Sequence, residues 1–186
     1  MNRAFLFIIL VLALPLSLAV QDLLPSLPPC RERIQLLPVV FAFGVLALPL
    51  VPALWFALFA AVVQGLSLVQ VQAGQAEIGL TLPVVFFLFW AIVLQMAGEA
   101  TKGMRWELHA AGSALVAFTM LSGEFLALCF RRGGFPADMT VLVRIAVPSV
   151  AALLLAPLFY LLLRSLVPLA PEEEQQGIPK STGPVR

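Results

Sequence analysis

The sequence predicts an all-α integral membrane protein with about six transmembrane helices in one compact bundle. Of its 186 residues, 61% are hydrophobic and only 11% are charged, whereas a soluble domain carries about 25% charged residues. The apolar residues also form runs of membrane-spanning length, for which about 20 residues are needed. Most charged residues lie between these runs. Together these observations exclude an ordinary soluble domain.

Apolar runs bounded by polar or proline-containing segments divide the chain into predicted spans. These spans cover residues 4–20, 35–48, 52–70, 79–97, 108–130 and 139–164. The break between the second and third spans is placed at Pro49 and Pro52, and no charged residue lies where these spans meet. This junction is therefore expected to lie below the headgroups, buried against protein. Residues 167–186 contain scattered proline and glycine and three consecutive glutamates, which predict a disordered cytoplasmic tail.

Two interpretations of the first apolar run remain open. It follows Arg3 and ends near Ser17-Leu18-Ala19, which resembles the small-residue site where a signal peptide is cleaved. A single basic residue and a second apolar run downstream favour a retained helix instead. An even number of spans places both termini on the same side of the membrane. Lys102 and Arg105 between the fourth and fifth spans favour a cytoplasmic location for both termini.

The sequence contains no recognisable catalytic or metal-binding motif. Its two cysteines, Cys30 and Cys129, form no CxxC motif, and His109 is the only histidine. We therefore predict idle thiols, no metal site and no cofactor, although a disulfide is possible if both cysteines face outward. Glu124 and His109 would lie about 22 Å apart on one helix, too far for joint acid–base chemistry. The protein is thus predicted not to be an enzyme, and a net charge of +1 argues against nucleic-acid binding.

The fifth and sixth predicted spans contain charged residues, Glu124 and Arg144, at a matching depth. Glu124 precedes the loop between these spans by six residues, and Arg144 follows the loop by six residues. Antiparallel helices would place both side chains about 9 Å from that loop. An ion pair between them would lower the free energy cost of burying each charge. Alternatively, the Arg144 side chain extends outward to the headgroups.

Helical spacing places Glu124 on a stripe with four other residues. The stripe consists of His109, Ser113, Ala117, Met120 and Glu124. Its small residues permit close helix packing, with Ser113 and Glu124 expected to face inward. His109, near the inner end of the span, is expected to be an interfacial side chain without a role. The stripe is either a polar lining for a ligand or partner helix, or a packing seam with one structural glutamate.

A second set of polar residues lies toward the end of the third predicted span. Gln64, Ser67 and Gln70 recur at helical spacing and are therefore expected to share one face. Polar side chains within a membrane face protein or water rather than lipid. We therefore assign Glu124, Arg144, Ser113, Gln64 and Gln70 to a predicted polar core that is either structural or partner-binding.

Several short motifs occur in a recognisable order. Arg33-Ile34-Gln35-Leu36-Leu37 leads into the two short spans, Gly65-Leu66 lies near the end of the third span, and Gly79-Leu80 begins the fourth. The fifth span contains Gly123-Glu124-Phe125-Leu126, and the sixth ends in Ala156-Pro157-Leu158-Phe159-Tyr160-Leu161-Leu162-Leu163-Arg164. Over about residues 4–166, this pattern resembles the MreD family of rod shape-determining membrane proteins.

The resemblance implies a six-helix fold related to the substrate-binding components of vitamin transporters. It also implies a non-catalytic role in the bacterial inner membrane, where the protein would bind an MreC-like partner and the elongation transpeptidase and glycosyltransferase. The sequence departs from the family at Val69 and Gln70, where an aspartate is common, and near Ala152, where an asparagine is frequent. The alternative is a vitamin-binding membrane subunit of an energy-coupling-factor transporter. It is motivated by the six-helix size, Glu124 and the glutamines.

Overall fold

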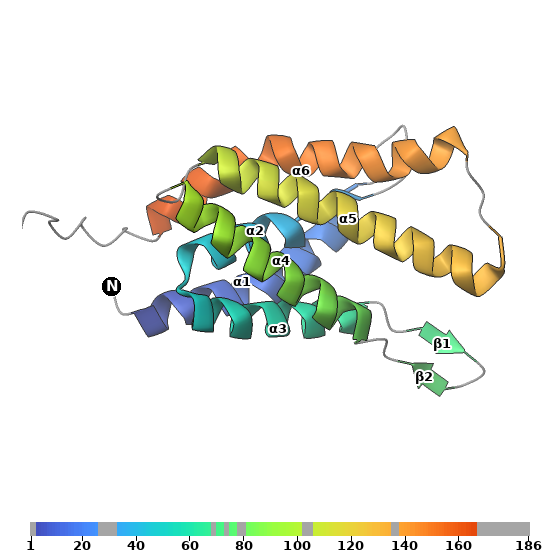
Figure 1. Cartoon of the computed structure of the whole chain (residues 1–186), viewed down its shortest axis with the longest axis horizontal. Coiled ribbons are helices and arrows are strands. Elements are labelled where there is room, and N and C mark those ends of the chain that lie inside the picture. Colours follow the sequence, from blue (N-terminus) through green and yellow to red (C-terminus); the bar gives the residue numbers. More distant parts are fainter. Residues whose placement is uncertain are drawn as a thin grey trace, which may run out of the picture.

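The computed structural model describes residues 3–25, 33–67, 70–72, 75–77, 81–101, 106–134 and 138–166. Within these ranges the chain forms six α-helices and one two-stranded antiparallel β-hairpin (Figure 1). The helices are α1 (Arg3–Leu23), α2 (Leu37–Ala47), α3 (Leu50–Ser67), α4 (Thr81–Ala100), α5 (Trp106–Arg132) and α6 (Met139–Leu166), and the strands are β1 (Gln70–Gln72) and β2 (Gln75–Glu77). The predicted tail at 167–186 lies outside the described residues.

Five of the described helices are long and apolar enough to cross a membrane, and α2 is the exception. The outer faces of these helices carry many large apolar side chains, such as Trp55 (64% exposed), Val85 (64%) and Leu154 (68%). Apolar exposure on this scale is unfavourable in water but suits a surface that faces lipid. The prediction of an all-α, multi-pass membrane bundle is therefore confirmed.

Helix α2 corrects the prediction that the short helix at residues 35–48 is one of six transmembrane spans. It has 11 residues and is therefore about 16 Å long, roughly half the 30 Å thickness of the hydrocarbon core. Every residue from Leu37 to Val45 is buried, and α2 contacts each of the other five helices. It forms the centre of the bundle (Figure 1). Hydropathy could not distinguish this helix from a span, because an apolar segment suits the protein interior as well as lipid.

Close packing against α2 depends on a glycine. A Cβ atom at Gly44 would overlap the ring of Phe56 on α3, so the absence of a side chain permits this contact. Phe41 of α2 lies parallel to Phe56, with ring centroids 6.2 Å apart. Phe87 of α4 meets Phe41 edge-on at 4.8 Å, a favoured geometry for aromatic pairs. These rings form the core between α2, α3 and α4.

Helix α3 ends earlier than predicted. Its last residue is Ser67, and the Ser67 hydroxyl donates a hydrogen bond to the backbone carbonyl of Gln64 at 2.7 Å. Gln70 lies in β1, opposite Glu77 of β2. The prediction that residues 52–70 form one helix, with Gln70 on the face of Gln64, is therefore wrong. Glutamine alternates with Val71 here, with the period of two that is typical of a strand. These residues therefore form a strand and do not continue the helix.

Helices α5 and α6 make the most extensive contact between any two elements. After α5 the chain turns at Gly133, where φ is +66°, and the Gly134 N–H donates to the Cys129 carbonyl at 3.3 Å. A left-handed glycine with this bond is a common way to end a helix. Helix α6 ends at the same end of the bundle at which α1 begins (Figure 1).

Asp138 immediately precedes α6 and is exposed. The Thr140 hydroxyl donates a hydrogen bond to Asp138 Oδ2 at 2.7 Å. This bond, followed by a bond from the backbone N–H of Thr140, lowers the pKa of the Asp138 carboxyl below its ordinary value. Such bonds favour the charged form of an aspartate at the start of a helix.

Candidate functional site

Glu124 lies in the second half of α5 and is half-buried. Gln64 of α3 is 7% exposed, and its Nε2 donates a hydrogen bond to Glu124 Oε1 at 3.2 Å. A carboxylate within a membrane-spanning helix needs such polar partners, because hydrocarbon provides none. The structure thus brings together two of the predicted site residues and uses them to link α3 to α5.

A small cavity adjoins this hydrogen bond. It has a volume of about 60 Å³ and lies between α3, α4 and α5. Gln64 and Glu124 provide its polar groups, and Pro83, Phe87, Met120 and Gly123 are among its apolar lining residues. Because water occupies about 30 Å³ in the liquid, the cavity has room for one or two water molecules. Pockets for vitamin-sized molecules usually measure about 300–1,000 Å³.

The structure does not place all predicted site residues at this cavity. Gln70 lies in the β-hairpin, which projects from the helices (Figure 1), so it does not continue the polar face that begins at Gln64. Arg144 is an exposed residue of α6. An ion pair between Arg144 and Glu124 stays a prediction.

The helical stripe on α5 faces the protein interior. Ser113 and Ala117 are 0% exposed and Met120 is 6% exposed, so Ser113 faces inward as its spacing predicts. The Ser113 hydroxyl donates a hydrogen bond to the His109 carbonyl at 2.7 Å, one turn earlier in the same helix. Since this bond satisfies the hydroxyl within its own helix, Ser113 contributes to packing between helices.

His109 corrects the expectation of an interfacial side chain, because it is 0% exposed. Its Nε2 lies 2.9 Å from the carbonyl oxygen of Val39 in α2. A carbonyl can only accept, so Nε2 carries a hydrogen and donates it to Val39. The rings of Phe43 and Tyr160 enclose the imidazole, with centroids 5.7 and 5.8 Å away. Within the described residues Nδ1 has no hydrogen-bond partner. His109 therefore connects α5 to the buried centre of the bundle.

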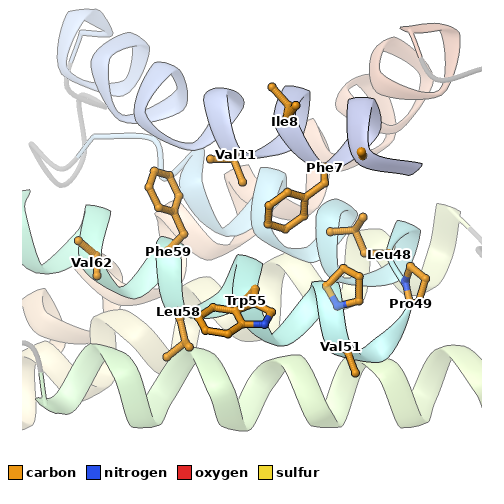
Figure 2. A pocket seen from close by; sticks show the side chains of 12 residues that line it. Phe7, Ile8, Val11, Leu48, Pro49, Val51, Trp55, Leu58, Phe59 and Val62 are labelled. Carbon is orange, nitrogen blue, oxygen red and sulfur yellow. The ribbon is translucent and has the colours of Figure 1, made fainter. Parts of the chain in front are cut away.

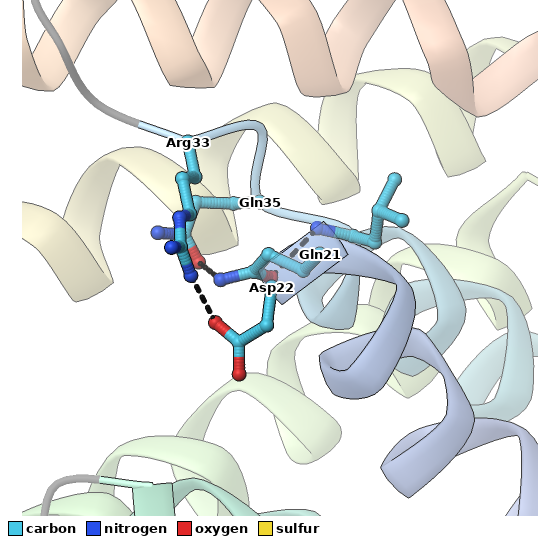
Figure 3. Close-up of polar contacts among 5 residues, drawn as sticks. Gln21, Asp22, Arg33 and Gln35 are labelled. Atoms are coloured by element: carbon cyan, nitrogen blue, oxygen red, sulfur yellow. Dashed lines mark hydrogen bonds and ion pairs between the residues drawn. The ribbon is translucent and has the colours of Figure 1, made fainter. Parts of the chain in front are cut away.

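The start of α2 is bonded to the end of α1. Gln21 Oε1 accepts a hydrogen bond from the backbone N–H of Leu36 at 3.1 Å, and Gln21 Nε2 donates to Gln35 Oε1 at 3.2 Å (Figure 3). Asp22 and Arg33 form an ion pair at 2.5 Å beside them (Figure 3). This pair is exposed and so contributes little to stability. The glutamine bonds matter more, since the first N–H groups of a helix have no partner within the helix.

The end of α2 is bonded to α4. Gln95 Nε2 donates to the backbone carbonyls of Val45 and Leu48, the latter at 2.8 Å. Leu48 is 4% exposed, so water cannot readily replace these bonds. Side chains from α1, α4 and α5 therefore satisfy backbone groups along the short buried helix, as the hydrocarbon environment requires.

Sequence reasoning missed Gln21, Gln95 and the burial of His109. A usable signal was present for Gln95, which is a single amide within the apolar run 79–97. Such a residue is expected to bond to another helix, although the sequence does not specify its partner. Gln21 lies at the edge of a polar loop, where a glutamine is common and does not indicate a contact with another helix.

The described residues contain no group of three or more histidine, cysteine, aspartate or glutamate side chains that could hold a metal ion. Comparisons of the chain with known protein families, curated proteins and solved structures found no match.

Proposed function

We propose that the protein is a non-catalytic component of the bacterial cell-elongation complex, where it binds an MreC-like partner and the peptidoglycan synthases. The order of MreD-like motifs along the chain supports this proposal. The observation that carries it is the placement of one of these motifs, Gly123-Glu124, beside the hydrogen bond from Gln64. A Cβ atom at Gly123 would meet no other atom within 4 Å. A partner helix can therefore approach the backbone here and reach the carboxylate.

The proposed location is the inner membrane, with both termini in the cytoplasm. The basic residues between the fourth and fifth predicted spans support this orientation. The position of the first turn of α1 and the last turn of α6 at the same end of the bundle is consistent with it (Figure 1).

The small cavity at Glu124 argues against the alternative of a vitamin-binding transporter subunit. At about 60 Å³ it is several times smaller than a usual ligand pocket, although it contains the very side chains that suggested a ligand. A thermal-shift measurement with a vitamin panel tests the alternative directly. A shift that is abolished by Gln64→Leu would favour the transporter function over the one proposed.

The proposal is tested by deleting the gene in its bacterial host and restoring it with variants. We expect deletion to round the cells and Glu124→Ala to restore rod shape poorly. The same substitution should reduce copurification of an MreC-like protein about tenfold or more, as truncation of a central contact residue usually does. Glu107→Gln is the matched control, because Glu107 is an exposed carboxylate on the same helix. Normal rod shape after deletion, together with no copurifying MreC-like protein, would rule the proposal out.

A further inference from the structure

A large apolar groove lies between α1 and α3 (Figure 2). Its volume is about 730 Å³. Phe7 and Val11 of α1 and Phe59 of α3 border it, and Leu48 and Pro49 lie toward one end (Figure 2). Its volume falls within the range of ligand pockets, about 300–1,000 Å³.

Both the lining and the location of the groove select for a hydrocarbon occupant. Every lining side chain is apolar apart from the indole N–H of Trp55. The rim residues Ile8 (54% exposed), Val51 (65%) and Trp55 (64%) lie on the outer surface of helices that cross the membrane. A polar ligand would lose its hydrogen bonds with water here and gain almost none in return.

The length of the groove matches one leaflet of a bilayer. Its α3 side extends from Val51 to Val62, which corresponds to about 16 Å along a helix. Half of a hydrocarbon core about 30 Å thick is about 15 Å. Trp55 lies five residues after the start of α3 at Leu50, and tryptophan favours the level of the headgroups. The polar end of an occupant would therefore lie at the Pro49 end of the groove. Pro49, Leu50 and Val51 are exposed there, which corrects the expectation that the junction between the second and third predicted spans is buried against protein below the headgroups.

The side chains that line the groove disfavour a transmembrane helix as the occupant. Close packing of helices in membranes depends on small residues that let two backbones approach, whereas this groove is bordered by Phe7, Trp55, Leu58 and Phe59. A helix with its side chains is also about 10–12 Å wide. A flexible acyl chain is much narrower and can follow the uneven surface between these bulky groups.

We propose that this groove binds one acyl chain of a phospholipid from the leaflet at the Pro49 end, which is retained when the protein is extracted from the membrane. The inference is independent of the proposed role in cell elongation, because it depends only on the groove and on the membrane location. It predicts a defined lipid that remains bound after the surrounding lipids have been washed away.

Native mass spectrometry of the full chain in detergent tests this proposal. We expect one retained phospholipid per protein, and about tenfold less retention in Val11→Phe and Val62→Phe, since burying two fewer methylene groups has an effect of this size. Val85→Phe is the matched control, because Val85 is exposed on α4 and does not line the groove. It should retain the lipid as the unchanged protein does. Helicity and melting temperature show which variants are folded.

A fluorescence experiment provides a readout that does not depend on groove-filling variants. The chain has three tryptophans, so Trp90→Phe with Trp106→Phe leaves Trp55 as the only one. This variant is loaded from vesicles of phosphatidylcholine with brominated chains and then transferred to detergent without bromine. Quenching of Trp55 that persists after transfer supports the proposal. Immediate loss of quenching, absence of a retained lipid, or a groove occupied by a second copy of the chain would overturn it.

Discussion

Replacing Gln95 with leucine should destabilise the protein through the end of α2. In the structure Gln95 Nε2 donates to the carbonyls of Val45 and Leu48. The last four carbonyls of a helix have no partner within it, and Val45 belongs to this set. Leucine has a similar volume, so the substitution removes the two bonds without leaving a large cavity. The expected effect therefore arises from the hydrogen bonds.

The magnitude follows from measured values for such bonds. An interhelical hydrogen bond in a membrane contributes about 0.6 kcal/mol on average and about 1.7 kcal/mol at most. A buried carbonyl without a partner is destabilising by about 1–3 kcal/mol. For two bonds donated by one amide, we expect Gln95→Leu to lower the free energy of unfolding by about 1–3 kcal/mol.

Equilibrium unfolding in mixed micelles, with increasing sodium dodecyl sulfate and helicity as the readout, measures this change. Met96→Leu is the control, because Met96 is the next residue in α4 and its side chain is 65% exposed on the outer surface of the bundle. It should change the free energy of unfolding by less than about 0.5 kcal/mol, as surface substitutions usually do. If Gln95→Leu were as stable as Met96→Leu, α2 would not depend on this amide, and the reasoning about its carbonyls would be wrong.

Three further predictions concern other positions. Gly44→Ala should lower the free energy of unfolding by about 1–3 kcal/mol through overpacking, whereas Gly123→Ala, which meets open space, should stay within about 1 kcal/mol of the unchanged protein. The pKa of Asp138 is lowered in the folded state, so its stabilisation should be complete above the unfolded pKa of about 3.9 and be lost as pH falls through the folded pKa. Asp138→Asn should therefore lower the melting temperature at pH 7, and the difference from the unchanged protein should disappear as pH falls below the folded pKa. If Glu124 and Arg144 pair, the double alanine variant should be more stable than the sum of the two single losses predicts; additive losses would rule the pair out.

Helix α2 and its neighbours indicate where sequence reasoning succeeds and where it ends. The proline pair at Pro49 and Pro52 marked the junction between α2 and α3, because a missing N–H and a fixed φ are local properties. The burial of α2 on all sides was not predictable in the same way. It depends on contacts with the five other helices. A uniformly apolar sequence is equally compatible with protein and with lipid as its surroundings.

The candidate site also has features that the sequence predicted and features that it did not. Helical spacing alone placed Ser113 and Glu124 on one inward face of α5, because 3.6 residues per turn is a property of any α-helix. It did not identify Gln64 as the donor to Glu124, since these residues are 60 positions apart. Spacing also failed at Gln70, where the assumption of a continuing helix was wrong and a strand begins instead.

By itself, the sequence determined that this is a helical membrane protein, that a helix break falls at Pro49 and Pro52, and which face of α5 points inward. These properties follow from hydropathy, proline and the helical repeat, which act over a few neighbouring residues. Only the tertiary structure decided that α2 is a buried half-length helix held by Gln21, Gln95 and His109, and that a groove remains between α1 and α3. Hydrogen bonds and cavities depend on which distant segments meet. Within hydrocarbon no water is present to bond to backbone groups. A helix can therefore end inside the protein only where side chains from other segments provide hydrogen-bond partners.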